Sequence, residues 1–163
     1  MKQRKSARAI LLNEQDQVLL MRHEDALPAD PALPEVLGYW ATPGGGVEDG
    51  ESEVEALRRE LREELRLTDV AIRRRIGVRE VQLELPGIGD VLSHETYYEC
   101  RVSETPVLNG EGLSEWERRV CKAIRWWPRE ELTETTEILR PAALPELVEH
   151  AFQVHADLMH LQS

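Results

Sequence analysis

Cysteine and phenylalanine are scarce in this chain of 163 residues, and long apolar runs are lacking. Two isolated cysteines, Cys100 and Cys121, are too few for a disulfide framework, and neither has the CxxC or Cys/His spacing of structural zinc. No apolar segment approaches the roughly 20 residues of a membrane span, and residues 1–17 turn polar too early for a secretory signal. We therefore expect a cytoplasmic protein with reduced thiols and no membrane partner.

Positive charge is also in deficit. The chain has 20 lysines and arginines against 31 aspartates and glutamates, a formal net charge of -11. Such a charge repels a phosphate backbone or an anionic membrane surface, so we expect no nucleic-acid polymer as a partner. The remaining partners are small molecules, proteins, or anions held through a bridging metal ion.

The length and the order of elements predict one domain over residues 1–163 with an α/β (α+β) fold. Alternating apolar runs indicate strands, and apolar residues at helical spacing indicate helices. The expected elements are a hairpin over 7–12 and 17–22, a loop over 23–38, a short strand over 39–43, a helix over 52–65, a second hairpin within 69–102, a strand over 120–127, a short helix with Pro128 in its first turn, and a closing helix over 144–161.

The predicted helix over 52–65 has a clear start and an apolar face. Ser52, with Glu55 three positions later, is typical of a capping box. At about 100° per residue, one narrow stripe of the helix is apolar and should pack on the sheet. This stripe contains Val54, Leu57, Leu61 and Leu65.

Acidic side chains gather beside that stripe. On the helical wheel Glu53, Glu60 and Glu64 cluster, with Glu63 next to them. Like charges at such spacing cost a few tenths of a kcal/mol per pair, so a compensating cation is expected unless arginines and water neutralise them. Mg²⁺ and Mn²⁺ favour carboxylate oxygens and keep waters that bridge to phosphates.

The spacing around this helix resembles the signature of the Nudix hydrolase (MutT-like) family. That signature is a glycine, five residues, a glutamate, seven residues, and then Arg-Glu-apolar-x-Glu-Glu-x-Gly-apolar. Eight of its nine positions match here, and Arg66 stands where the family usually has glycine. The arginine suggests a differently terminated or extended helix end. The matching positions are Gly45, Glu51, Arg59, Glu60, Leu61, Glu63, Glu64 and Leu67.

The resemblance implies an α/β/α sandwich with a mixed sheet and a metal-dependent hydrolase. Members cleave the diphosphate bond of a nucleoside diphosphate linked to another group, by water attack on phosphorus. It implies that Mg²⁺ or Mn²⁺ is held by Glu60, Glu63, Glu64 and the Gly44 carbonyl. Glycines let the backbone approach metal and phosphate closely, and bound metals neutralise phosphoryl charge.

Further site residues follow from the same resemblance. Glu63 and Glu64 are candidate catalytic residues, and Glu63 either binds metal or orients the attacking water. Arg59 is expected to support catalysis through a salt bridge with Glu51. An acid outside the motif serves as general base in many members; Glu117 or Glu115 is the candidate here, with Glu95 as a rival.

Substrate contacts are predicted for a small set of residues. The candidates are Arg22, Gly45, Gly46 and Glu51. Aromatic side chains are candidates for stacking a base, although each could equally pack in the core. These are Trp40, Trp116, Trp126, Trp127, Tyr39, Tyr97 and Tyr98.

The sequence leaves the substrate open among small nucleotide derivatives. An alternative function is a nucleotide-sensing domain without turnover, but such domains would be expected to lose motif acids that are present here. Isoprenoid diphosphate isomerases depart from the motif and use a catalytic cysteine. Dimers are common in the family, so a homodimer is a further expectation, with an interface at 23–38 or at the C-terminal helix.

Overall fold

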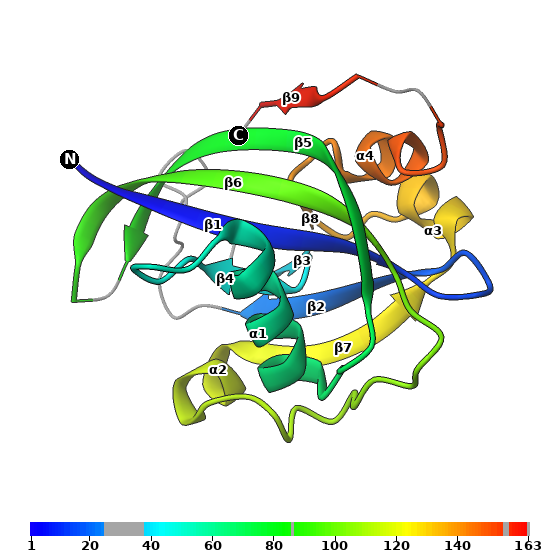
Figure 1. Cartoon of the computed structure of the whole chain (residues 1–163), viewed down its shortest axis with the longest axis horizontal. Helices are drawn as coiled ribbons and strands as arrows, with labels where there is room; N and C mark the ends of the chain where they lie inside the picture. Colours follow the sequence, from blue (N-terminus) through cyan, green and yellow to red (C-terminus); the bar gives the residue numbers. More distant parts are fainter. Residues whose placement is uncertain (25–37, 86, 155–156, 163) are drawn as a thin grey trace.

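The computed structural model describes residues 1–24, 38–85, 87–154 and 157–162. Within these ranges the chain forms nine strands, joined in one sheet, and four helices (Figure 1). In chain order they are β1 (Lys2–Leu12), β2 (Val18–Glu24), β3 (Gly38–Ala41), β4 (Gly44–Gly46), α1 (Glu53–Leu65), β5 (Ala71–Leu85), β6 (Gly89–Arg101), α2 (Glu115–Val120), β7 (Cys121–Trp127), α3 (Arg129–Glu134), β8 (Leu139–Arg140), α4 (Leu144–His150) and β9 (Met159–Leu161).

The sheet is mixed and its main path runs β8-β3-β2-β1-β6-β5-β9. Strands β1 and β6, β3 and β8, and β5 and β9 pair in parallel, and the other pairs are antiparallel. Strand β7 pairs with β2, and β4 pairs with β1. The mixed-sheet prediction is confirmed.

Strand β1 lies at the centre of the sheet, and its residues 9–12 are buried on both faces. Ala7, Ala9 and Leu11 belong to a core that also contains the buried leucines of α1. Ile10 and Leu12 point to the other face, into a core closed by α3 and α4. Because successive side chains of a strand alternate between faces, this one strand serves both hydrophobic cores. Figure 1 shows α1 against the sheet, away from α3 and α4.

Both predicted hairpins form, with one difference. Strands β5 and β6 pair along their length, whereas β1 and β2 meet at Leu12 and Val18 next to the turn. Before that point, Ser6–Arg8 of β1 pair with β4 instead. Because β1 and β2 diverge, β4, which consists of Gly44–Gly46 and is called the glycine strand below, can pair with β1.

The predicted closing helix over 144–161 is wrong beyond His150. Helix α4 ends there, and Met159–Leu161 form β9 beside β5, with Gly77 opposite Met159. The Arg74 guanidinium donates hydrogen bonds to the carbonyls of His150 (3.3 Å) and Ala151 (3.4 Å) at the end of α4. Apolar spacing continued past His150, but these long-range contacts and the free edge of β5 decided the structure.

The other predicted elements are confirmed in outline. The strand over 39–43 corresponds to β3, and the strand over 120–127 corresponds to β7. Pro128 is the N-cap of α3 and not a residue of its first turn. The loop predicted over 23–38 lies, apart from its ends, outside the described residues. No helix in the described part of the chain is long and apolar enough to cross a membrane.

Candidate active site

Helix α1 is positioned by its cap and its leucines. The Ser52 hydroxyl accepts a hydrogen bond from the Glu55 N–H at 3.1 Å, so the predicted N-cap forms, but the contacts of the described residues do not include the Glu55 side-chain bond of a full capping box. Leu57, Leu61 and Leu65 are buried against the sheet, but Val54 is 36% exposed and does not join the core. Val54 sits in the first turn, so the stripe that packs is shorter than the sequence predicted.

The C-terminus of α1 ends in the ordinary left-handed conformation, so the predicted altered or extended end is wrong. Arg66 itself adopts φ 58°, and its N–H bonds to the Arg62 carbonyl at 3.0 Å. The next N–H, of Leu67, bonds to the Leu61 carbonyl at 3.3 Å. These are the hydrogen bonds of a Schellman-type cap, which glycine usually completes. Here an arginine takes the same backbone conformation.

The three predicted metal ligands lie on one side of α1, at different depths. Glu64 is buried, and its Oε1 accepts a hydrogen bond from the Gly44 N–H at 3.1 Å. The side chain of Glu60 is 16% exposed and that of Glu63 is 58% exposed. The acids therefore run from a buried carboxylate beside β4 to one in solvent.

Strand β4 requires glycine. Gly44 has φ 136°, and a Cβ there would lie 2.2 Å from the Ala7 carbonyl oxygen. A Cβ on Gly45 would lie 2.5 Å from Oε1 of Glu60. Only a residue without a side chain fits between β1 and these carboxylates, which keeps backbone and acids in direct contact.

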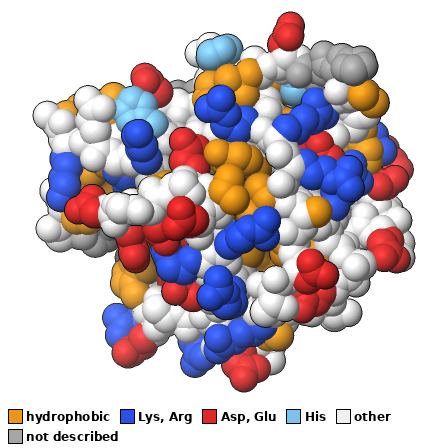
Figure 2. All heavy atoms as spheres, in the orientation of Figure 1, with side chains coloured by type: hydrophobic (Ala, Val, Ile, Leu, Met, Phe, Trp, Pro, Cys, Tyr) orange, Lys and Arg blue, Asp and Glu red, His pale blue; other side chains and the backbone are white. Residues whose placement is uncertain are grey.

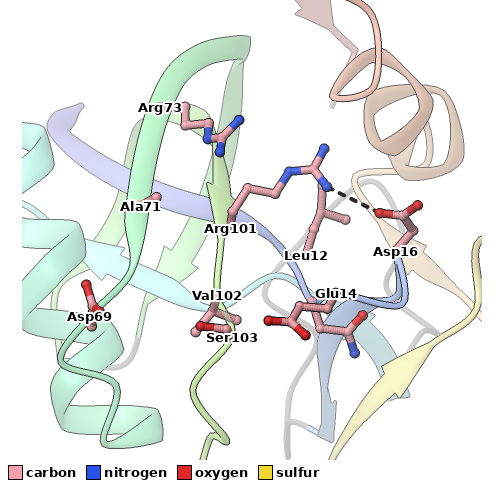
Figure 3. Close-up of a pocket in the computed structure, with 10 residues that line it drawn as sticks. Leu12, Glu14, Asp16, Asp69, Ala71, Arg73, Arg101, Val102 and Ser103 are labelled. Carbon is pink, nitrogen blue, oxygen red and sulfur yellow. Dashed lines mark hydrogen bonds and ion pairs between the residues drawn. The ribbon is translucent and has the colours of Figure 1, made fainter.

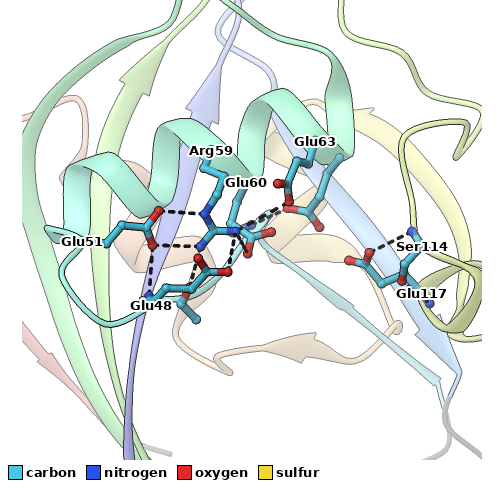
Figure 4. A network of polar contacts seen from close by, with 10 residues as sticks. Glu48, Glu51, Arg59, Glu60, Glu63, Ser114 and Glu117 are labelled. Atoms are coloured by element: carbon cyan, nitrogen blue, oxygen red, sulfur yellow. Dashed lines mark hydrogen bonds and ion pairs between the residues drawn. The ribbon is translucent and has the colours of Figure 1, made fainter.

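Arg59 joins the acids to the glycine strand (Figure 4). Its Nε lies 2.7 Å from Glu51 Oε2, and its Nη2 donates to Glu51 Oε1 and to the Gly46 carbonyl, both at 3.0 Å. Its Nη1 lies 3.1 Å from Glu60 Oε1 and 3.6 Å from Glu63 Oε2. The Arg59 guanidinium thus contacts its predicted salt-bridge partner, Glu51, and two predicted metal ligands, Glu60 and Glu63.

Among these acids, Glu64 is the one whose ionised form is least favourable. Burial, followed by the charge of Glu60, raises its pKa from 4.5 to about 8; Arg8 and the Gly44 N–H act in the opposite direction, and Glu117 raises it further. Burial also raises the pKa of Glu60, although Arg59 opposes this change. A cation beside both carboxylates would remove the cost of ionising them.

Carboxylate oxygens are suitable ligands for a hard divalent cation, but those of this site do not form a complete coordination sphere. Among the described residues, no group of three or more His, Cys, Asp or Glu side chains is close enough to hold a metal ion. Glu60 and Glu63 instead contact Arg59. Carboxylate oxygens beside a glycine backbone still match the ligands of Mg²⁺ and Mn²⁺, so the residues fit the ion.

Of the candidate general bases, Glu117 is directed toward the acids (Figure 4). It raises the pKa of both Glu60 and Glu64, which places its charge in the same site. Its carboxylate also caps α2: Oε1 accepts from the Ser114 N–H at 2.9 Å, while the Glu117 N–H donates to Ser114 Oγ at 3.2 Å. Glu115 is 87% exposed and pairs with Arg119 on the same helix at 3.0 Å.

Glu95 is occupied by a different network. Its Oε2 lies 3.2 Å from Arg8 Nε, and its Oε1 lies 2.8 Å from Arg79 Nε. Burial alone would raise the pKa of Glu95, but the two arginines lower it below its usual value. A carboxylate held ionised between two guanidinium groups is a poor proton acceptor. Sequence analysis did not select Arg8 as a site residue, although a charged residue within the apolar run 7–12 could have indicated a special role.

Of the predicted substrate-binding residues, Gly45, Gly46 and Glu51 lie beside Arg59 and Glu60, whereas Arg22 and the aromatic residues are dispersed. Arg22 pairs with Glu24 and lies opposite Trp40 in the β2–β3 ladder. Trp40 and Trp127 are buried and pack edge to face with their ring centroids 5.1 Å apart. His23 stacks on Tyr39, and burial lowers the pKa of His23 to about 4. Trp116, 54% exposed, is the neighbour of Glu117.

A separate groove of about 520 Å³ lies at the other end of β1 (Figure 3). Leu12 lines it, whereas the glycine strand pairs with Ser6–Arg8. Its charged side chains have both signs, with Arg73 and Arg101 among Glu14, Asp16 and Asp69. Mixed charge also characterises the face that carries α1 (Figure 2).

The fold and the acidic helix beside a glycine strand define a class of hydrolases that act on nucleotides. The family model for the NUDIX domain matches residues 2–147, and the chain belongs to this family. It is a Nudix hydrolase, in a family whose members act on small nucleotide substrates and generally use divalent metal ions. No curated protein sequence gives a significant match.

Solved structures agree with this assignment. The Escherichia coli ORF135 protein is 26% identical, with a TM-score of 0.58 over 93% of this chain and 89% of that one. A MutT protein from Methanosarcina mazei Go1 is 22% identical, with a TM-score of 0.62 over 93% and 94%. An ADP-ribose pyrophosphatase from Streptococcus suis is 17% identical, with a TM-score of 0.62 over 96% and 98%. The latter two likenesses concern the fold.

Proposed function

We propose that this chain is a divalent-metal-dependent pyrophosphohydrolase that cleaves the diphosphate bond of a nucleoside diphosphate linked to another group. The observation that carries the proposal is Glu64, a buried carboxylate beside Glu60 that contacts the Gly44 N–H. A buried carboxylate with a raised pKa, placed among further acids, is typical of a site that receives a cation. The motif acids Glu60, Glu63 and Glu64 are all present, which disfavours the nucleotide-sensing alternative.

The ligands in this proposal are Glu60, Glu63 and Glu64, with the Gly44 carbonyl as a backbone ligand. Mg²⁺ or Mn²⁺ would supply charge neutralisation on the phosphoryl group and lower the pKa of a bound water. Arg59 holds Glu60, Glu63 and the Gly46 carbonyl in one arrangement. The residues for substrate contact are Gly45, Gly46, Glu51 and Arg22.

The proton of the attacking water passes to a carboxylate of this chain. Glu63 is the most exposed of the three proposed carboxylate ligands, and Glu117 faces this group of acids from α2. Either is placed to accept the proton as the water oxygen attacks phosphorus and the bond to the leaving phosphate breaks. Glu95 is excluded from this role in the proposal because Arg8 and Arg79 hold it ionised.

The proposal extends to the whole chain as one domain, residues 1–163, acting in the cytoplasm on a small nucleotide. Both cysteines are free thiols, as a reducing compartment requires. A homodimer is part of the proposal, and sedimentation or light scattering of the purified chain tests it directly.

The test is a panel of nucleotide substrates with Mg²⁺ and Mn²⁺. The panel comprises ADP-ribose, nucleotide sugars, dinucleoside polyphosphates and noncanonical triphosphates, with release of nucleoside monophosphate or phosphate as the readout. Glu64→Gln and Glu63→Gln should each lose most of the activity, while Glu55→Gln, an exposed acid of the same helix, should keep it. No turnover of any substrate with either metal would reject the proposed reaction. Full activity in both site variants would reject the ligand set.

A further inference from the structure

Strand β1 presents polar side chains next to the glycine strand. Arg4, Ser6 and Arg8 alternate along one face of β1, with Ser6 opposite Gly46 and Arg8 opposite Gly44. The Ser6 hydroxyl is buried and has no hydrogen-bond partner in the described part of the chain. A buried hydroxyl and two arginines are unusual at the centre of a sheet, and they need a reason.

Arg8 has its partners within the protein. It pairs with Glu95 at 3.2 Å and donates from Nη1 to the Thr42 carbonyl at 3.0 Å. Glu95 also pairs with Arg79 and accepts a hydrogen bond from the Tyr97 hydroxyl at 3.4 Å. Both oxygens of this carboxylate therefore already contact a guanidinium, and neither is paired with Arg4 in the described part of the chain.

Arg4 is that third arginine. It is half-buried, and it makes no hydrogen bond or ion pair with any residue in the described ranges. Its guanidinium lies against Gly46, where a Cβ would come within 3.0 Å of Nη2. Burial and the charge of Arg8 lower the pKa of Arg4, whereas Glu95 and Glu60 act in the opposite direction. A desolvated cation without a partner is costly unless a ligand supplies the anion.

Gly46 lies between two guanidinium groups. Arg59 reaches its carbonyl oxygen from the side of α1, and Arg4 lies over its Cα. On the α1 side, Arg59 is neutralised by Glu51, Glu60 and Glu63. On the other side, Arg8 and Arg79 share Glu95, and Arg4 lies near them without an ion pair to any residue in the described ranges. The glycine strand thus separates an acidic cluster from a cationic one.

We propose that Arg4 binds a phosphate group of the substrate, on the opposite side of β4 from the acidic residues of α1. This inference rests on the proposed function and assigns a phosphate-positioning residue outside the motif. A guanidinium presents a planar fork of N–H donors that matches two phosphate oxygens, and phosphate would supply the negative charge that the cationic cluster lacks. The phosphates would then lie across the glycines, between Arg4 and the ligands on α1.

The test compares Arg4→Gln and Arg4→Lys with Arg73→Gln. Arg73 is an exposed arginine of β5 at the remote groove, and no contact of its side chain is found in the described ranges. Calorimetry with inorganic pyrophosphate in the presence of EDTA measures anion binding without metal. Steady-state kinetics with the best substrate of the panel separates KM from kcat, and thermal unfolding shows that each variant is folded.

Arg4→Gln should weaken pyrophosphate binding by about 10- to 100-fold, since hydrogen bonds to charged groups contribute about 1.5–3 kcal/mol. It should raise KM by a similar factor and change kcat less. Arg4→Lys, which keeps the charge but not the fork, should fall between the wild type and Arg4→Gln, and Arg73→Gln should match the wild type.

Unchanged pyrophosphate affinity and unchanged KM in folded Arg4→Gln would overturn the assignment. Equal losses in Arg4→Gln and Arg73→Gln would also overturn it, because the effect would then be one of net charge. The outcome is separable from the proposed function: a wild type that binds pyrophosphate through Arg4 but hydrolyses nothing would refute the reaction alone. A wild type that turns over while Arg4→Gln behaves normally would refute the binding role alone.

Discussion

Glu51 and Arg59 are joined by two contacts, Nε to Oε2 at 2.7 Å and Nη2 to Oε1 at 3.0 Å. This paired geometry holds the loop before α1 against the helix, and it lowers the pKa of Glu51 to about 2. The same guanidinium contacts Glu60 and Glu63. The Glu51–Arg59 pair therefore also fixes the positions of Glu60 and Glu63.

Replacement of the Arg59 guanidinium should affect catalysis more than folding. In Arg59→Lys, one ammonium cannot make both contacts to Glu51 and also reach the Gly46 carbonyl. We expect kcat to fall by about 10- to 100-fold because small displacements of catalytic groups are costly. The control is Arg62→Lys on the exposed side of the same helix. Equal kcat values for Arg59→Lys and Arg62→Lys would show that the brace has no catalytic importance.

The raised pKa of Glu64 predicts how stability depends on pH in the metal-free protein. The folded state holds the Glu64 proton up to about pH 8, while the unfolded chain releases it near the ordinary value of 4.5. Between these values the folded state binds more protons, so its stability falls as pH rises and then levels off. Each pKa unit corresponds to about 1.4 kcal/mol, so the total change is a few kcal/mol.

Thermal unfolding in EDTA from pH 4.5 to pH 9 measures this dependence. Glu64→Gln should flatten the curve and be more stable than the wild type above pH 8, and Glu55→Gln should leave it unchanged. Added Mg²⁺ should restore wild-type stability at high pH, because it binds the ionised carboxylate. A wild-type protein that becomes steadily more stable from pH 5 to pH 8 in EDTA would contradict the assigned pKa.

The left-handed Arg66 predicts a stabilising substitution. Glycine adopts φ 58° without the steric cost that an arginine bears, so Arg66→Gly should raise the free energy of unfolding by about 1 kcal/mol. For a chain of this size the Tm should rise by about 2–4 °C. The matched change Arg62→Gly, inside the helix, should instead destabilise by about 1 kcal/mol. If both variants are destabilised alike, the left-handed conformation does not occur in solution.

The capping role of Glu117 and its proposed role as general base can be separated by substitution. Glu117→Gln keeps an oxygen that can accept from the Ser114 N–H but loses the charge, so a role as general base predicts a fall in kcat of about 10²-fold or more at nearly unchanged Tm. Ser114→Ala removes the hydroxyl that accepts from the Glu117 N–H. It should lower stability by about 1 kcal/mol and leave kcat close to the wild type. The reverse pattern would make Glu117 a helix cap alone and leave Glu63 as the proton acceptor.

Local sequence patterns predicted what is determined locally. The Ser52 cap and the buried face of Leu57, Leu61 and Leu65 lie within one short segment, where spacing fixes geometry, and the Glu51–Arg59 pair in the same segment was expected from the family resemblance. Arg66 shows the limit of such rules, because the helix ended normally without the usual glycine. The family's preference for glycine here reflects the energetic cost of the left-handed conformation for other residues. The contacts around Arg66 outweigh that cost.

Long-range pairing could not be read from the sequence. The Arg8–Glu95–Arg79 network forms because β1 lies between β4 and β6, and no spacing along the chain shows that arrangement. Strand β9 was missed for the same reason: helical apolar spacing up to Leu158 extended the predicted helix to 161, but residues 159–161 meet an open edge of β5. Contacts between distant segments decided both outcomes.

The parallel pairing of β1 with β6 also dictates an order of events during folding. Residues 2–12 pair along their whole length with residues 91–101, so the central strand stays without its main neighbour until those residues have left the ribosome. Contacts between segments so far apart form slowly, because a long loop must close first. Until then Arg8 lacks its partner Glu95, which lies on β6. Binding of a nucleotide should therefore appear as one of the last steps of refolding, together with pairing of β1 and β6 and after α1 has formed.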